Sequence, residues 1–423
     1  MTLEIHAIGV SAGDATLIVS RNPMSATTIL IDGGIDIDTV ASYLQKLGIY
    51  KIDLIVATHP DYDHLEGLVQ VINSPILSIS ELWCFDLSIL RDFFRDGTIS
   101  LSKKEDHRIV YCFLTADHLL REATIKGIQA YQVTSGHSRT FGDLYVQVLY
   151  PPNQFYEYIM KEAILRRILT QKNIPLDWFP ADFENLQEKD GRTISRREWQ
   201  SAVKKILMER KPITKNPREK ARDLYQESVG LGQEFSFTGE SLFNEMSIVL
   251  KIEACYEDHR FSLLFPGDLS NWTYLIATKI SELSTNLWKI PHHGSFRVCW
   301  DPHKAFNYSE RLVVGRGKFG GGLTEISTFP NCLCPRVFRP ETHIGSLEEI
   351  SKIINPSYFL VYPYPARKLP DADLKQMISP TSVLFTNRED ENPLCLNKST
   401  NKPRSIIIKK DDSGNQLFKS NLK

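Results

Sequence analysis

The sequence contains no run of 18 or more apolar residues, which is the minimum that marks a candidate membrane-spanning helix. Its opening residues, MTLEIHAIGV, also lack the positively charged segment and long apolar stretch of a signal peptide. We therefore expect no membrane span and no secretory leader.

Cysteine is scarce and scattered. Seven cysteines occur among 423 residues, and only Cys332 and Cys334 lie close together. An odd, dispersed set predicts a reducing, cytoplasmic location rather than a disulfide scaffold. The sequence also lacks an excess of positive or negative charge, since its net charge is −1. The total charge therefore indicates no particular kind of binding partner.

The sequence does contain an alternation of short β-rich runs with helical segments. LEIHAIGV, ATLIVS and TTILIDGG are predicted strands, and DIDTVASYLQKLGI is a predicted helix with Asp36 or Asp38 as its cap. KIDLIVATH is a further buried strand, and HLEGLVQVI begins the next helix. This alternation predicts an α/β layered domain.

Composition divides the chain into three segments. We expect residues 1–153 to form the first part of the α/β domain, 154–238 a basic helical insertion, and 239–423 the remainder, with an irregular loop at about 301–351. Residues 161–222 hold 16 Lys and Arg against 9 Asp and Glu. This excess suits a nucleic-acid backbone, and it suits equally a solvated cap that shields a site or docks a partner protein.

Four chemistry-bearing residues crowd the junction between that buried strand and helix. They are His59, Asp61, Asp63 and His64, in the stretch THPDYDH. Carboxylates that converge on one spot repel each other unless a cation neutralises them. On an extended loop, side chains two residues apart point to the same side, so the stretch predicts a metal site.

Later strand ends carry residues of the same types. LLFPGD ends an apolar strand on Asp268, and LWKIPHHGS ends another on His292 and His293. A lone Gly-Asp pair is usually a turn, and a lone His pair is often a surface feature. Three such clusters at strand ends nevertheless point together to a metal centre that could hold two ions.

THPDYDH, PGD and PHHGS, in this order, resemble the motifs of the metallo-β-lactamase-fold hydrolases. The resemblance is closest to the branch that includes the hydrolase domain of the competence DNA-uptake proteins. HAIGVSAGDATLI, ILIDGG and NEMSIVL resemble further motifs of that branch. The resemblance implies a four-layer αββα sandwich with a metal site at one edge.

The same resemblance implies a two-metal site with a bridging hydroxide as the nucleophile. Asp63 would also orient the attacking water, and Asp32 would support the site from behind without binding metal. The implied ligands are His59 and Asp61 for the first ion, Asp63 and His64 for the second, Asp268 as the bridge, and His293 or His292 to complete the set.

Two departures from the commoner family pattern matter. Asp61 stands where many members have histidine, which shifts the expected ions toward Mn²⁺ or Mg²⁺, with Zn²⁺ as the alternative. A further histidine ligand before the PGD strand is missing, and Asn244 and Ser247 occupy that part of the chain. His137 in TSGHSRTFGD is either that ligand reached by another path or a turn residue, and its chain order favours the turn.

The expected function is therefore metal-dependent hydrolysis, most specifically of DNA or RNA phosphodiesters. A small-molecule hydrolase acting on lactones, thioesters or cyclic nucleotides is the alternative, and a non-catalytic scaffold is a third. Expected partners are a nucleic acid at the basic insertion and, in a defence-type operon, a second protein.

Overall fold

The computed structural model describes residues 2–85, 104–152, 243–244, 246–256, 259–295, 298, 347–362, 383–385, 404–409 and 416–420. The predicted insertion at 154–238 lies outside these residues. The predicted loop at 301–351 also lies outside them, apart from its last five residues, which begin a helix.

The first sheet has the strand order β16-β15-β1-β2-β3-β4-β5-β7. Neighbours from β16 to β3 are antiparallel, and those from β3 to β7 are parallel. Its strands are β1 (Thr2–Ala7), β2 (Thr16–Arg21), β3 (Ala26–Ile31), β4 (Lys51–Val56), β5 (Ser78–Cys84), β7 (Gln129–Gln132), β15 (Arg404–Lys409) and β16 (Gln416–Ser420).

The second sheet has the order β14-β13-β12-β11-β10-β9-β8. It too combines an antiparallel part, from β8 to β11, with a parallel part, from β11 to β14. Its strands are β8 (Ser138–Phe141), β9 (Leu144–Tyr150), β10 (Val249–Tyr256), β11 (His259–Phe265), β12 (Leu287–Lys289), β13 (Tyr358–Val361) and β14 (Val383–Phe385).

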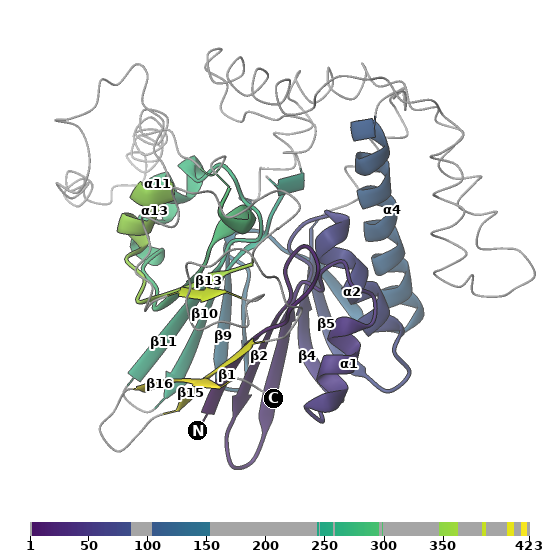
Figure 1. Ribbon diagram of the computed structural model, residues 1–423, viewed down its shortest axis with the longest axis horizontal. Helices are drawn as coiled ribbons and strands as arrows, with labels where there is room; N and C mark the ends of the chain where they lie inside the picture. The colour runs from purple at the N-terminus through teal and green to yellow at the C-terminus, as the bar shows by residue number, and fades with distance from the viewer. Residues whose placement is uncertain are drawn as a thin grey trace, which may run out of the picture.

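Helices cover the outer face of each sheet (Figure 1). α1 (Thr39–Lys46), α2 (Tyr62–Asn73) and α4 (Lys104–Ile125) flank the first sheet, and α11 (Thr273–Lys279) and α13 (Leu347–Ile354) flank the second. Two 3-10 turns, η1 (Ile280–Glu282) and η2 (Pro291–Gly294), follow α11 and β12. The layers therefore run helix, sheet, sheet, helix, which confirms the predicted αββα class.

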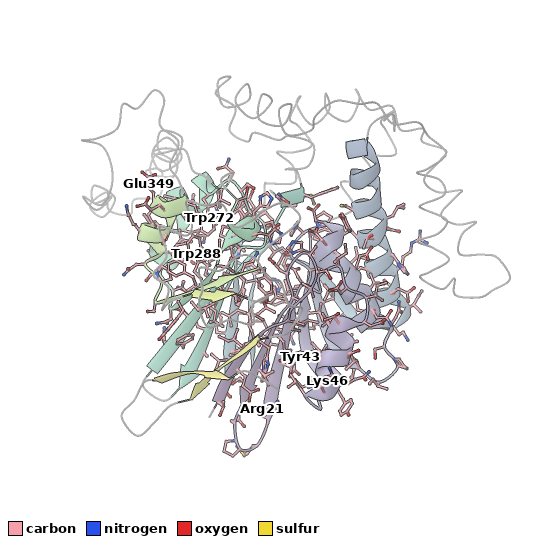
Figure 2. All side chains as sticks on the ribbon, viewed as in Figure 1. Arg21, Tyr43, Lys46, Trp272, Trp288 and Glu349 are labelled. Atoms are coloured by element: carbon pink, nitrogen blue, oxygen red, sulfur yellow. The ribbon has the colours of Figure 1, made fainter. Side chains whose placement is uncertain are left out.

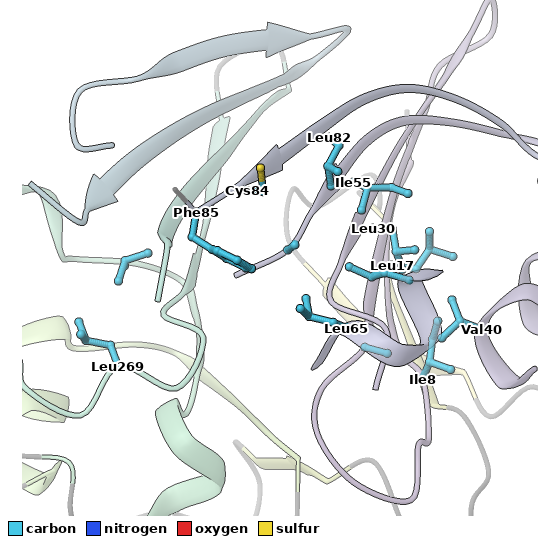
Figure 3. Close-up of a cluster of buried hydrophobic side chains, with 14 of the residues drawn as sticks. Ile8, Leu17, Leu30, Val40, Ile55, Leu65, Leu82, Cys84, Phe85 and Leu269 are labelled. Atoms are coloured by element: carbon cyan, nitrogen blue, oxygen red, sulfur yellow. The ribbon is translucent and has the colours of Figure 1, made fainter. Parts of the chain in front are cut away.

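Strand alternation explains why both faces of a sheet are buried. On β4, Leu54 and Val56 pack into the core between the sheets, whereas Ile55, which lies between them, packs under the helices. Successive side chains of a strand point to opposite faces, so a continuous apolar run fills two cores at once. Figure 3 shows Ile55 in the helix-side core together with Leu65 of α2.

Aromatic side chains fill the opposite flank. Trp272 and Trp288 meet edge-on, with ring centroids 5.7 Å apart and planes at 82°, between the second sheet and its helices (Figure 2). Such aromatic pairs contribute about 0.5–1.5 kcal/mol beyond their buried area.

One helix cap differs from the prediction. Asp38 holds the N-cap position of α1 but makes no side-chain capping bond. Asp36 instead accepts hydrogen bonds from the backbone N–H (2.6 Å) and the hydroxyl (2.9 Å) of Ser11. Its carboxylate therefore fastens the loop after β1 to the segment before α1.

Candidate metal centre

The candidate site lies where several strand ends meet. His59 to His64 follow β4, and Asp268 and the two adjacent histidines follow β11 and β12. β3 and β4 are parallel neighbours, as are β11 and β12, so each pair presents its carboxyl ends at one sheet edge. The sandwich thus brings segments far apart in sequence to a common place.

Close backbone contacts fix the first turn of α2. A Cβ added at Gly13, whose φ is +78°, would lie 1.6 Å from the carbonyl oxygen of Asp63. A Cβ added at Gly67 would lie 1.9 Å from the carbonyl oxygen of Gly33, and Gly33 N–H donates to the carbonyl of His64 at 2.8 Å. Only glycine permits such approaches. The loops after β1 and β3 therefore hold the helix turn that carries Asp63 and His64.

This turn differs from the extended loop expected from the sequence. The chain is extended only to Asp61, and α2 begins at Tyr62, which places Asp63 and His64 in the first helical turn. The stretch from His59 to His64 is therefore not one extended loop: a short loop ends at Asp61, and a helix N-terminus follows it.

Asp32 sets the orientation of two imidazoles. Its carboxylate accepts hydrogen bonds from Thr58 N–H (2.8 Å), Thr58 Oγ1 (2.7 Å) and His64 Nδ1 (2.9 Å). Since the single Thr58 hydroxyl proton goes to Asp32, Thr58 Oγ1 accepts from His59 Nδ1 at 2.9 Å. In their neutral forms, both histidines therefore carry the lone pair on Nε2.

The two Nε2 atoms face the interior of the site. Nε2 of His59 is buried with no hydrogen-bond partner among the described residues, and it lies 4.0 Å from Oδ2 of Asp61. Oδ1 of Asp63 is likewise buried and unpartnered in the described part of the chain. Buried polar atoms left unpaired are costly, so these orphaned atoms are what a cation would satisfy.

Asp268 lies between two imidazoles. Its Oδ2 is 3.4 Å from Nε2 of His64 and 3.3 Å from Nε2 of His293. The Nδ1 of His293 lies 3.2 Å from the carbonyl of Tyr362, to which it can donate. The second imidazole is therefore also oriented with Nε2 toward the carboxylate.

Electrostatics around Asp268 favour positive charge. Burial opposes protonation of His64, but the carboxylates of Asp268 and Asp32 outweigh it and raise the His64 pKa well above its usual range. Burial is likewise outweighed at His293, where Asp268 and Asp14 raise the pKa to about 9. Protonation of His64 and His293 is therefore favoured in the absence of metal, and a metal ion would have to displace these protons to bind the same nitrogen atoms.

Asp61 is held from α4. The thiol of Cys112 donates to Oδ1 of Asp61 at 3.5 Å, which leaves Oδ2 on the side of His59. Both residues are buried, as are all seven predicted ligands. Imidazole nitrogens and carboxylate oxygens in this density fit divalent ions.

Donor atoms converge in two groups within 4.8 Å, Asp32-His59-His64 and Asp14-His64-His293. Asp32 already accepts three hydrogen bonds from its neighbours, which suits a supporting role.

His292 is turned away from His293. Its φ is +46°, and the rings of the two histidines lie 6.2 Å apart at 70°. Its Nδ1 is 3.1 Å from Ser270 Oγ and 3.5 Å from Asn244 Nδ2. The structure therefore brings His293, not His292, against Asp268.

Ser247 lies at the candidate site, whereas His137 lies away from it. Ser247 Oγ accepts a hydrogen bond from the backbone N–H of Asp268 at 3.1 Å, so it supports the site. His137 packs edge-on against Trp83, with ring centroids 4.6 Å apart, and near Tyr131. Its ring lies among aromatic side chains of the first sheet rather than with the cluster.

Two residues of the site were missed from the sequence. Asp14 follows Gly13 in the loop after β1, and Lys289 ends β12. Lys289 Nζ contacts Asp14, Oδ1 of Asp268 at 3.3 Å and the carbonyl of Gly267 at 2.8 Å. A lysine inside the apolar strand LWKI was the available signal, because lysine is almost never fully buried unless paired.

Comparison with known proteins supports the αββα fold class. Residues 8–77, from just after β1 to just before β5, match the family described as the metallo-beta-lactamase superfamily. Together with the two sheets and their flanking helices, this match identifies the metallo-β-lactamase fold, with candidate metal-binding residues at the sheet edges. No curated protein matches the chain.

Several solved structures are similar at low identity. Rm3 metallo-beta-lactamase is 9% identical over 62% of this chain and 58% of its own, with a TM-score of 0.27. CmlA, a diiron beta-hydroxylase from Streptomyces venezuelae, is 12% identical over 85% of this chain and 44% of its own, with a TM-score of 0.34. MEM-A1, a subclass B3 metallo-beta-lactamase from a soil metagenome, is 12% identical over 74% of this chain and 90% of its own, with a TM-score of 0.30.

The chain thus spans less than two thirds of the first two of these structures. Among the described helices, none has the length and apolar character that a bilayer crossing requires.

Proposed function

We propose that this protein is a metal-dependent hydrolase that cleaves phosphodiester bonds in DNA or RNA. The observation that carries the proposal is the composition of the donor set. The carboxylates of Asp61, Asp63 and Asp268 are all buried. Asp268 lies within 3.4 Å of the imidazoles of His64 and His293, and Asp61 lies 4.0 Å from that of His59. Such an oxygen-rich set suits Mn²⁺ or Mg²⁺, the ions most often paired with phosphate chemistry.

The metal-binding roles divide by position. His59 and Asp61 would hold one ion, and Asp63, His64 and His293 the other, with Asp268 between them. Two such ions lower the pKa of a bound water and offset the charge of a phosphoryl group.

The chain's own groups complete the chemistry. Asp32 and Thr58 keep the Nδ1 protons in place, so that His59 and His64 present lone pairs. Oδ1 of Asp63, which is buried and unpartnered among the described residues, can accept a proton from an attacking water. Sequence resemblance to the competence-type branch also supports a nucleic-acid substrate, and so does the basic segment 154–238, which lies outside the described residues.

The test is a panel of Mn²⁺, Mg²⁺ and Zn²⁺ against single-stranded and duplex DNA, RNA and a chromogenic phosphodiester. Asp63→Asn should abolish cleavage while the far-ultraviolet circular dichroism stays unchanged. His137→Ala is the matched control and should retain activity, because that ring lies against Trp83 rather than in the cluster.

Other outcomes identify other functions. Hydrolysis of lactones, thioesters or cyclic nucleotides without cleavage of polymers would replace the nuclease proposal with a small-molecule hydrolase. Failure of the purified protein to retain Mn²⁺, Mg²⁺ or Zn²⁺ would indicate a non-catalytic scaffold. Cleavage that persists in Asp63→Asn would contradict the proposed mechanism.

A further inference from the structure

Lys289 is buried where an ammonium ion is expensive. It ends the short strand β12, is 2% exposed, and stands between the apolar residues Trp288 and Ile290. Removing a charge from water costs several kcal/mol (order of magnitude) unless partners compensate it. Its three partners, Asp14, Asp268 and the Gly267 carbonyl, match the three donors of an ammonium group.

These contacts belong to a closed ring of alternating charge. Lys289 contacts Asp14, whose Oδ1 lies 3.4 Å from Nδ1 of His293. Nε2 of His293 lies 3.3 Å from Oδ2 of Asp268, and Oδ1 of Asp268 lies 3.3 Å from Lys289 Nζ. The ring therefore joins one metal-facing imidazole and one metal-facing carboxylate through a single lysine.

The two oxygens of Asp268 have different surroundings. Oδ1 lies against Lys289, whereas Oδ2 lies between Nε2 of His64 and Nε2 of His293. A carboxylate with one oxygen already engaged can offer only the other to metal, whereas a free one can chelate a single ion with both. Asp14, the carboxylate next to Nδ1 of His293, is held in place by the same ammonium group.

We propose that Lys289 is a positioning residue for the metal centre: it engages Oδ1 of Asp268, so that only Oδ2 would be left to bind the ions, and it holds Asp14 behind His293. Supporting groups behind metal ligands typically contribute 10–100-fold (order of magnitude) to metal affinity. The inference rests on the two-metal site of the proposed function. It concerns how ions are held, not which substrate is cleaved.

The decisive experiment measures bound manganese in the full-length chain. Wild-type protein is loaded with Mn²⁺, desalted and examined by elemental analysis and low-temperature electron paramagnetic resonance. We expect a pair of ions with an exchange-coupled signal. In Lys289→Met, Asp268 is free to chelate one ion with both oxygens, so we expect a single ion and the uncoupled six-line signal.

A second variant guards against misfolding. Lys289→Met leaves Asp14 buried without its ammonium partner, which is strongly destabilising in itself. Asp14→Asn/Lys289→Met removes both charges, so it should melt near the wild-type temperature and still bind only one ion. Lys251→Met is the matched control, since Lys251 also donates to a backbone carbonyl (Glu282, 2.8 Å) but on β10, and it should keep the coupled pair.

A folded Lys289 variant that retains the coupled pair of ions would overturn the inference, even if its melting temperature falls, because that result indicates a purely structural lysine. Wild-type protein that binds fewer than two ions would overturn it as well. Absence of phosphodiester cleavage in a protein that holds two coupled ions would refute the proposed function alone.

Discussion

Replacing Gly13 by alanine tests whether the first loop fixes the metal-binding turn. The new Cβ would lie 1.6 Å from the carbonyl oxygen and 2.5 Å from the carbonyl carbon of Asp63, whereas ordinary van der Waals contact begins at 3.4 Å. Both atoms belong to the backbone of α2 and cannot rotate away. The first helical turn must therefore move, together with its ligands Asp63 and His64.

The magnitude can be separated into two parts. A residue with a Cβ pays about 1–2 kcal/mol for the left-handed conformation that Gly13 adopts. Gly48 isolates this part, because its φ is +67° and an added Cβ meets nothing within 4 Å. We expect Gly48→Ala to lose about 1–2 kcal/mol of unfolding free energy and Gly13→Ala to lose more than about 4 kcal/mol, since the overlap is added to the strain.

Urea denaturation of the metal-free protein, followed by circular dichroism, gives both free energies. Titration with Mn²⁺ then reports the site, and Gly13→Ala should bind more weakly than Gly48→Ala. Equal losses of stability in the two variants, with equal Mn²⁺ affinity, would refute the claim that this contact positions α2.

Four further outcomes are expected. Asp32→Asn weakens the anchor of His64 and should lower Mn²⁺ affinity about 10–100-fold in a competition titration, and unchanged affinity would argue against its supporting role. Elemental analysis should show that His293→Ala loses bound metal and His137→Ala does not, and the reverse pattern would exchange their roles. Leu65→Ala should lower the free energy of unfolding in urea by about 2–5 kcal/mol, because it leaves a cavity in the helix-side core. A smaller loss would mean that the surrounding side chains move in to fill the cavity. Chelation should lower the melting temperature, because ions that bind only the folded state at 100 times their dissociation constant add about 2.7 kcal/mol, and no shift would speak against a metal-loaded protein.

The sequence predicts those features that depend on local pattern. The apolar run before His59 and the helical spacing after His64 correspond to β4 and α2, because burial on two faces and on one face leave different periodicities. The order of strand, turn and helix also places Asp268 at a strand end. What lies at an element's end is therefore readable from neighbouring residues.

The sequence does not reveal Asp14 and Lys289 as site residues, because the role of each depends on its contact with the other in the folded protein. Each alone is an ordinary residue, an aspartate in a turn and a lysine in a short strand, and nothing local says that the turn after β1 faces the end of β12. The sequence does not decide between His292 and His293 for a similar reason, since the choice depends on a backbone turn with φ of +46° and +54° that no local pattern specifies.

The first sheet joins the start of the chain to its far end, since Thr2 of β1 pairs opposite Lys409 of β15. Ribosomes add about 5–20 residues per second, so β1 waits about 20–80 seconds for this neighbour. During that time one row of its N–H and C=O groups has no strand beside it, and such an edge can join strands of other nascent chains. Vectorial synthesis therefore makes the β1 edge a point at which a chaperone would protect this fold, and arrest before residue 404 leaves that edge open.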